Sequence, residues 1–353
     1  MSARGVGFLV IACASFAFSA CGERSGDNKT EQSSAARVSE ALDPCAEDDG
    51  FAQQVCQNQT LSAIDSEVRD LLVAESAEIS DAGARLLVQN QNRWREAARI
   101  LCGIADARAA PTADQQSCLQ SRFRARLEAA RTAVQEIGGY TFQRMELVEA
   151  APLDGWMAAT AGGAPAAAER NIRFPRIDGR QTPAIRRFNE LVQQEPEFRL
   201  QDGVSETVDY TIAYAGPEII SVRFDKSVEA ATAANVTSTV NAVTVLMDEG
   251  RLLTAADVFR AGSGWEDFIT DRAVRAIARE FPDYANFPPR RDVYETATKP
   301  HLWLVTERGL TILFPPLSFG GSHADGGAEV NISWADLRTY LNPAAPAPIR
   351  ASA

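Results

Sequence analysis

The stretch from Cys102 to Cys118 reads CGIADARAAPTADQQSC and joins two segments whose apolar residues recur at helical spacing. Before it, Trp94 lies on one apolar face, and after it Leu119 and Phe123 share another. The stretch itself is polar and contains a proline, which interrupts helices. A short connection makes the two helices antiparallel neighbours, so the two cysteines should lie close together.

The spacing predicts three helices in this region. We expect the first to begin with Thr60 as its N-cap residue. The third begins with Thr112 and Gln115, which have the spacing of a capping box. Its apolar stripe extends to Val134, and the glycine pair at 138–139 ends it.

Four of the six cysteines, Cys45, Cys56, Cys102 and Cys118, fall in this helical region, residues 43–137. An even number in an exported chain predicts two disulfides. We prefer Cys45–Cys56 with Cys102–Cys118, because both bonds close short loops. A link from Cys45 or Cys56 to the second or third helix is an alternative. A metal site is another, although the chain has no close Cys-x-x-Cys pair here.

Residues 1–20 have the features of an export signal: one basic residue, an apolar run and small residues at the end. The apolar run is shorter than the roughly 20 residues that a spanning helix needs. The segment from Phe18 to Cys21, FSAC, resembles a bacterial lipobox. This resemblance implies lipidation of Cys21 and an anchor on the periplasmic side of the inner or outer membrane. An ordinary secretory signal is the alternative. Residues 21–42 are polar and predict a disordered tether.

The chain is acidic, with 35 Lys and Arg against 47 Asp and Glu and a net charge of −12. Residues 1–20 contain Arg4 and no acidic residue. The mature chain therefore has 34 basic and 47 acidic side chains, and a net charge of −13. This charge argues against nucleic acid, which requires clustered Lys and Arg. It favours a cationic partner.

Three motifs accompany the four cysteines: LSAID at 61–65, QNRW at 91–94 and FRARL at 123–127. Together they resemble the N-terminal domain of the LprI-type lysozyme inhibitors, a DUF1311-like domain. The resemblance covers residues 43–137 and implies the binding of a lysozyme. The family usually has an arginine four residues after the tryptophan, where this chain has Ala98.

Several of these side chains also have structural explanations. Trp94 on an apolar stripe is expected in a core, and Asp65 at a helix surface or cap. The arginines of the third helix are expected on a solvated face, paired with Glu128 and Glu136. They are Arg122, Arg124, Arg126 and Arg131.

After residue 138 the spacing changes from helical to alternating, beginning with a strand at 140–148. Further strands, mostly joined by hairpins, and a few helices follow up to residue 343, and residues 344–353 form a tail. The predicted fold class is therefore α+β. It consists of a disulfide-stapled three-helix module followed by an antiparallel sheet domain at 138–343.

A second resemblance rests on DEGRLLTAADVF at 248–259, GLTILF at 309–314 and ADGGAEVNI at 324–332. These segments are similar to the DUF3298-type domain of RsiV-type anti-sigma factors and of some peptidoglycan deacetylases. The resemblance covers residues 170–343. In the anti-sigma relative this domain binds lysozyme, so both resemblances imply the same ligand. The family often has a histidine where residues 226–235 of this chain have none.

The chain has two histidines, His301 and His323, as candidate catalytic bases. Ser322 and Asp325 flank His323, but sequence neighbours rarely form a triad, and no Gly-x-Ser-x-Gly motif occurs. No zinc-protease, Walker or Rossmann pattern occurs either. A glycosidase with two carboxylates far apart in sequence is an open alternative that no motif supports. We therefore expect no enzymatic activity, catalytic residue, cofactor or metal site.

The sequence thus predicts an envelope lipoprotein that binds, and inhibits, lysozyme or a similar muramidase. The predicted contacts lie in a glycine-rich loop, because exposed loops often carry binding residues. They are Gly320, Gly321, Ser322, His323 and Asp325. One alternative is an accessory envelope protein that binds peptidoglycan or a protein partner without inhibition. Another is a wall-modifying hydrolase.

Overall fold

A computed structural model describes the greater part of the chain. The described ranges are 33–46, 50–77, 79–160, 167–179, 181–233, 236–282, 288–321 and 326–350. Residues 33–353 form one compact unit, and the fold below is that of its described residues.

The N-terminal part of this unit is helical, and its three long helices are those predicted from the sequence. Two short helices that the sequence did not predict precede them. The first lies within the predicted tether, residues 21–42, and is ordered because Val38 and Leu42 are buried in the core. The helices are α1 (Ser34–Ala41), α2 (Gly50–Gln57), α3 (Gln59–Ser76), α4 (Asp81–Leu101) and α5 (Ala113–Arg131). The first long helix, α3, begins earlier than predicted. Asn58, not Thr60, is its N-cap residue, and its side-chain oxygen accepts hydrogen bonds from the backbone N–H groups of Thr60 and Leu61.

The predicted capping box of α5 is confirmed. The Thr112 hydroxyl accepts a hydrogen bond from the Gln115 N–H at 3.3 Å, and the Gln115 side chain accepts one from the Thr112 N–H at 2.9 Å. We expect Thr112→Ala to lower the free energy of unfolding by about 1 kcal/mol, because it leaves a helix-terminal N–H without its partner. Urea unfolding of the two proteins measures this loss. Thr298→Ala, which removes a partly buried hydroxyl that donates to the Tyr294 carbonyl and caps no helix N-terminus, should change stability less.

The end of α5 differs from the prediction. The helix stops at Arg131, and Val134–Ile137 forms strand β1 instead of continuing the helix. Gly138 and Gly139, with φ of 61° and 82°, turn the chain into the next strand. A Cβ at Gly138 would lie only 2.0 Å from the carbonyl oxygen of Ala215, so this turn accepts only glycine. Val134 fits the helical stripe by spacing, but strand pairing determines its conformation.

A seven-stranded sheet follows, with its strands in sequence order from β1 to β7. The strands after β1 are β2 (Tyr140–Pro152), β3 (Ala167–Ile177), β4 (Val204–Ala215), β5 (Ile219–Ala230), β6 (Thr237–Leu246) and β7 (Arg251–Leu252). The α+β class is confirmed, but the sheet is not wholly antiparallel. Strands β3 and β4 pair in parallel, with Arg170 opposite Glu206 and Ile172 opposite Val208. Parallel neighbours need a long crossover, and the segment containing α7 (Pro183–Val192) and the short 3₁₀ helix η1 (Leu200–Asp202) provides it.

The C-terminal part forms a second sheet of three antiparallel strands in the order β10-β9-β8. They are β8 (Trp303–Val305), β9 (Gly309–Phe314) and β10 (Ala328–Ser333). The helices around it are α8 (Ala255–Val258), α9 (Trp265–Glu280), α10 (Arg290–Ala297), η2 (Pro300–Leu302) and α11 (Trp334–Leu337). Helix α10 was not predicted. Ser221 and Thr244 join the two sheets: the Ser221 hydroxyl accepts from the Val305 N–H, and the Thr244 hydroxyl donates to the Trp303 carbonyl.

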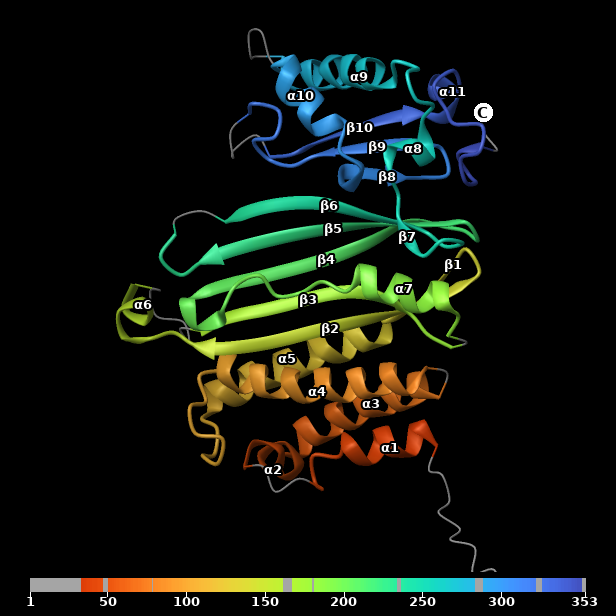
Figure 1. The fold of residues 1–353 in the computed structure, drawn as a ribbon. Helices are drawn as coiled ribbons and strands as arrows, with labels where there is room; N and C mark the ends of the chain where they lie inside the picture. Colours follow the sequence, from red (N-terminus) through yellow and green to blue (C-terminus); the bar gives the residue numbers. More distant parts are fainter. Residues whose placement is uncertain are drawn as a thin grey trace, which may run out of the picture. The chain divides into compact units, whose positions relative to one another are not determined.

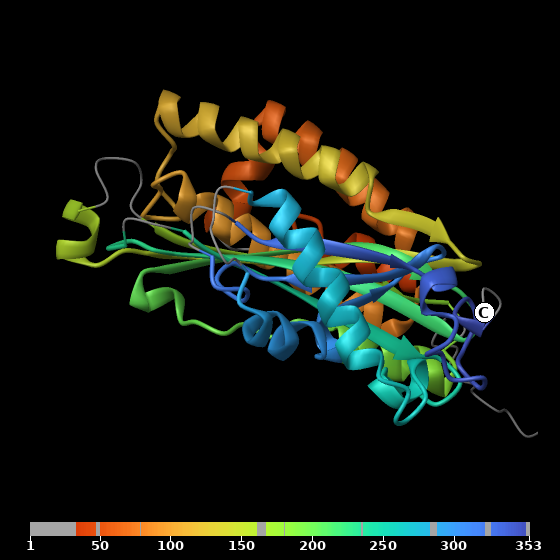
Figure 2. The same ribbon diagram turned by 90° about the horizontal axis from the view of Figure 1, so that it is seen from above.

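The helices pack on the β2 side of the large sheet, and the small sheet lies beside β6 (Figure 1). One hydrophobic core contains Leu72 and Leu87 of the helices together with Met145 and Phe174 of the sheet. Helix α4 packs against β2, and α5 leads directly into β1 (Figure 2). The β2–β3, β5–β6 and β9–β10 connections lie at one end of this unit, opposite the turns β1–β2 and β4–β5 (Figure 1). Helix α6 (Gly155–Thr160) belongs to that loop end.

Candidate functional site

The four cysteines of the helical region form the two preferred disulfides. Cys45 is bonded to Cys56, and Cys102 to Cys118, with Cα atoms 5.3 and 5.7 Å apart. The second bond joins the end of α4 to the start of α5, as the short connection between them predicts. Both bonds keep the helices in place and present no free thiol. Cys21 lies outside the described residues.

The predicted contact loop joins β9 to β10. Gly320 is exposed with φ of 83°, and a Cβ there would meet Pro289 at 2.9 Å. Gly321 follows it, whereas Ser322, His323 and Asp325 lie outside the described residues. The structure therefore places two of the five predicted contact residues, both at the loop end of the fold.

Asp65 is not at a helix surface or cap, contrary to the sequence interpretation. Its side chain is buried between α3 and α4 and pairs with Arg95 through two hydrogen bonds of 2.8 and 3.1 Å. Arg95 also donates to the carbonyl oxygen of Leu42 at 2.5 Å. Trp94 lies in the core, as expected, and packs edge-on against Phe123 at 4.9 Å between ring centres. These motif residues hold the helices together.

The prediction that the arginines of α5 form a solvated face is wrong for Arg126. It is buried, and its guanidinium forms an ion pair with Glu146 of β2 and donates to Gln91 of α4 at 2.9 Å. Its neighbours Arg122 and Arg131 are at the surface, and Arg131 pairs with Glu128 as predicted. Burial lowers the pKa of Arg126, and the charge of Glu146 opposes that shift.

The Glu146 carboxylate is shared among three arginines. Besides Arg126, it accepts a hydrogen bond from Arg173 at 2.9 Å, and the Nε of Arg144 lies 3.4 Å away. Glu75 of α3 lies close to this group and accepts a hydrogen bond from Gln143 at 2.8 Å. Burial raises the pKa of Glu75 to about 7, against the lowering effects of Gln143, Arg126 and Arg144. This cluster joins three helices to the sheet and is closed to a large ligand.

A second row of charges crosses the sheet from α4 to β5, with the sign alternating at each step. It begins with Arg93 3.6 Å from Glu149, and Glu149 lies 2.6 Å from Arg170. Farther along the row, Arg170 is 3.6 Å from Glu206, Glu206 is 2.8 Å from Lys226, and Lys226 pairs with Glu197. Strand register produces this order, because parallel pairing sets Arg170 opposite Glu206.

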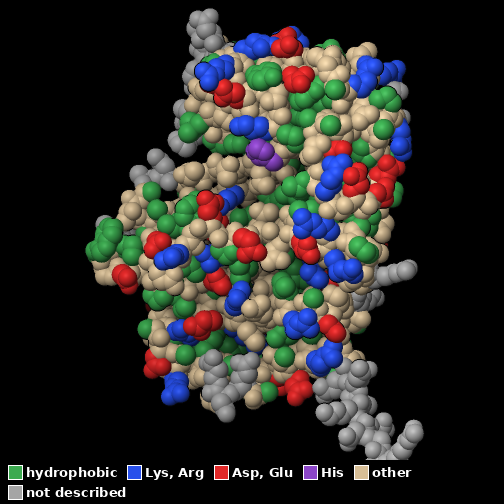
Figure 3. Space-filling model, in the orientation of Figure 1, with side chains coloured by type: hydrophobic (Ala, Val, Ile, Leu, Met, Phe, Trp, Pro, Cys, Tyr) green, Lys and Arg blue, Asp and Glu red, His purple; other side chains and the backbone are tan. Residues whose placement is uncertain are grey.

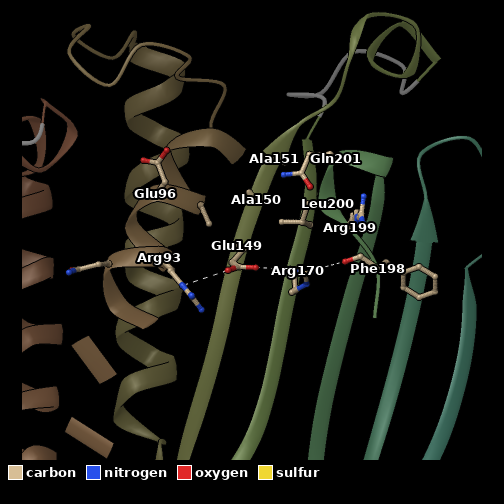
Figure 4. A pocket seen from close by; sticks show the side chains of 12 residues that line it. Arg93, Glu96, Glu149, Ala150, Ala151, Arg170, Phe198, Arg199, Leu200 and Gln201 are labelled. Atoms are coloured by element: carbon tan, nitrogen blue, oxygen red, sulfur yellow. Dashed lines mark hydrogen bonds and ion pairs between the residues drawn. The ribbon is translucent and has the colours of Figure 1, made fainter. Parts of the chain in front are cut away.

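A cavity of about 640 Å³ opens at the α4 end of this row (Figure 4). Arg93 and Glu96 reach it from α4, Glu149 from β2 and Arg170 from β3 (Figure 4). Residues 198–201 form the opposite wall. The charge row runs along one side of the cavity, so it presents both donors and acceptors to whatever enters.

His301 is exposed, and burial of part of its ring together with the charge of Lys299 lowers its pKa. In the described ranges, no three His, Cys, Asp or Glu side chains gather as metal ligands. No helix of the described chain combines the length and apolar character needed to span a bilayer.

Comparison with known proteins adds two structures. No protein-family model matches the chain, and no curated protein matches it. A DUF3298 family member from Bacteroides fragilis NCTC 9343 is similar in structure, with 11% identity and a TM-score of 0.43, over 62% of this chain and 98% of that one. A DUF3298 family protein from Pseudomonas aeruginosa PAO1 is 13% identical with a TM-score of 0.38, over 58% and 95% of the two chains. The LprI-type resemblance of residues 43–137 stays a prediction.

Proposed function

We propose that this chain is a lipid-anchored protein of the bacterial envelope that binds and inhibits a cationic muramidase of the lysozyme type. The export signal, the lipobox-like segment and two disulfides favour the oxidising side of the inner membrane. The two sequence resemblances imply a lysozyme as ligand. The mature charge of −13 favours a basic partner.

The observation that carries this proposal is an exposed tryptophan at the loop end, on a segment that the fold brings close to segments with exposed acidic residues. Trp156 on α6 has 67% of its surface exposed. Asp154, Asp202 and Glu229 are exposed around it and form no ion pair with the described residues. We name these four residues the α6 surface.

Contacts within the fold bring the α6 surface together from three segments. Gly203 packs against both Met157 and Ala231. A Cβ atom built on Gly203 would lie 2.7 Å from the Met157 sulfur and 3.6 Å from the Ala231 side chain. The Ala231 N–H also donates to the Gly203 carbonyl at 2.8 Å. The acidic residues next to these contacts therefore lie near the tryptophan. Elsewhere, acidic and basic side chains are interspersed, as one face shows (Figure 3).

An aromatic side chain with a rim of one charge is suited to protein recognition. Tryptophan is frequent among the residues that dominate binding energy. Unpaired carboxylates around it attract a basic partner and increase the association rate. The β9–β10 connection, with the predicted contact residues Gly320 and Gly321, lies at the same end (Figure 1). A single globular partner could therefore contact both.

The test is titration of purified residues 22–353 against hen egg-white lysozyme, with binding measured by calorimetry and inhibition by turnover of cell walls. We expect binding that weakens with salt, because exposed charges are screened beyond about 10 Å at 0.1 M ionic strength. Absence of binding at micromolar concentration in low salt would overturn the proposal. Co-sedimentation with purified sacculi instead of lysozyme would favour an accessory protein that binds the wall.

Trp156→Ser should weaken lysozyme binding by about thirtyfold, since truncation of a central aromatic residue costs roughly 2 kcal/mol. Tyr294→Ser is the matched control, because Tyr294 is also exposed but lies on α10, outside the α6 surface. Calorimetric titration of both variants gives the comparison. Equal affinities of the two variants would show that the partner contacts another surface.

A further inference from the structure

The cavity beside α4 has the size and walls of a small-molecule site. Its volume of about 640 Å³ lies within the range of pockets that hold organic ligands. Three elements and one connecting segment, far apart in sequence, form its walls. Ala97, Ala150, Ala151 and Leu200 provide apolar lining. The cavity is therefore much larger than an inorganic anion requires, and part of its wall is apolar.

The polar lining is basic, although the chain as a whole is acidic. Arg93, Arg170 and Arg199 line the cavity against Glu96 and Glu149. Glu96 is already paired with Arg99. Arg199 is exposed and forms no ion pair with any described residue. The lining thus has cationic groups in excess of the carboxylates available to them, so it favours a ligand with negative charge.

Arg170 also has an unused donor. Its side chain is only 9% exposed, yet its Nε–H has no hydrogen-bond partner among the described residues. The closest Glu206 oxygen to this nitrogen is 3.6 Å away, beyond hydrogen-bond distance. The other end of the guanidinium is occupied, since it donates to Glu149 and to the carbonyl of Phe198. A buried donor without an acceptor is costly, and an ordered water between this nitrogen and Glu206 would satisfy it.

The mixture of groups indicates the chemistry of the ligand. The wall offers donors on the arginines and acceptors on Glu149, with the amides of Asn92 and Gln201 able to do both. Hydroxyl groups donate and accept, so a hydroxyl-rich molecule can bond to both kinds of wall, whereas a phosphate or simple carboxylate offers acceptors alone. The apolar alanines can pack against the C–H face of a sugar ring. Because the lining has one more arginine than it has carboxylates, we expect that molecule to carry one carboxylate.

We propose that this cavity binds an acidic saccharide of about disaccharide size, with its carboxylate at Arg199 and its hydroxyl groups at Arg93, Glu149, Arg170 and Gln201. This site adjoins the α6 surface, because its lining residue Gln201 directly precedes Asp202, but it shares none of the four residues of that surface. Its ligand does not depend on the proposed binding of a muramidase.

The test compares three probes by calorimetry on purified residues 22–353. They are the disaccharide of N-acetylglucosamine and N-acetylmuramic acid, the neutral disaccharide chitobiose, and citrate. We expect the acidic disaccharide to bind at least about tenfold more tightly than either of the others, because only it combines a carboxylate with sugar hydroxyls.

Arg199→Gln and Arg93→Gln should each weaken binding of the acidic disaccharide by about tenfold or more, since each removes a charged hydrogen-bond donor. Arg279→Gln is the matched control, because Arg279 is also exposed and without an ion pair in the described chain, but lies on α9. This control should bind as the wild type does. All three variants should titrate lysozyme unchanged, which separates this site from the proposed function.

Three results would overturn the inference. The first is no binding of the acidic disaccharide at millimolar concentration. The second is equal binding of chitobiose or citrate, which would show that the carboxylate or the sugar hydroxyls do not matter. The third is binding that Arg199→Gln and Arg93→Gln leave unchanged, which would place the saccharide elsewhere on the chain.

Discussion

Glu146→Ala should lower the free energy of unfolding by about 3–5 kcal/mol, because it removes one partner of a buried ion pair and leaves the other uncompensated. Arg126 would lose its counter-charge while remaining enclosed by α4, α5 and β2. Arg173 and Arg144 would lose the same carboxylate, but Arg173 is partly exposed and retains Asp209 at 3.0 Å. The predicted loss therefore comes chiefly from Arg126.

Urea unfolding at pH 7 measures this loss, with Glu169→Ala as the control. Glu169 lies on the next strand and pairs with Arg122 of the same helix at 3.5 Å, but both side chains are about one-third exposed (34%). An exposed pair of this kind contributes about 1 kcal/mol or less. Similar losses for the two variants would show that water reaches Arg126 in solution.

A double variant tests the same explanation from the other side. Replacing a buried ion pair by apolar residues of similar volume is often close to neutral, because no charge is left without a partner. Glu146→Met combined with Arg126→Met should therefore recover most of the stability that Glu146→Met alone loses. If the loss of stability in the double variant equals the sum of the losses in Glu146→Met and Arg126→Met, the ion pair is not the source of the effect.

The position of Arg126 could have been predicted from the sequence. The apolar face of α5 contains Leu119, Phe123, Leu127 and Ala130, and Arg126 is seven residues after Leu119 and three after Phe123. Both spacings place it on the buried face. The expectation that Arg126 lies on a solvated face rests on its charge alone. An arginine inside an apolar stripe instead predicts a buried acidic partner, which here is Glu146.

Other features depend on contacts that local patterns do not contain. The helical spacing that includes Val134 is real, but pairing with β2 makes this segment a strand. The hairpins were predictable from alternation and turn residues. The parallel pairing of β3 with β4 had one local signal, the helix between the two strands, because helical crossovers are typical of parallel neighbours. The α+β class therefore followed from periodicity, whereas the strand order required the structure.

The candidate sites show the same limit. Both disulfides join residues separated by 11 and 16 positions, so short-loop arguments sufficed for them. The cavity brings Arg93 of α4 near Glu149 of β2 and Arg199 of the crossover. No motif links these three residues, because strand register and helix packing determine their proximity.

The pH dependence of stability should depend on Glu75. Burial raises its pKa in the folded chain from 4.5 to about 7, so the folded state holds this proton more tightly than the unfolded state does. Its contribution to stability is complete below about pH 4.5, is lost as the pH rises to 7, and does not change further above that. A difference of this size in pKa corresponds to a loss of up to about 3 kcal/mol.

Glu75→Gln should abolish this part of the pH dependence. The glutamine side chain is neutral at every pH and has an oxygen that can still accept the hydrogen bond from Gln143. Urea unfolding at pH 5 and pH 8 should show a smaller difference for Glu75→Gln than for the wild type, with the variant more stable at pH 8. Glu67→Gln is the control, because Glu67 is exposed on the same helix and pairs with Arg131 at 3.2 Å. If both variants retain the wild-type difference between the two pH values, then Glu75 is ionised in the folded chain and Arg126 and Arg144 outweigh the effect of its burial.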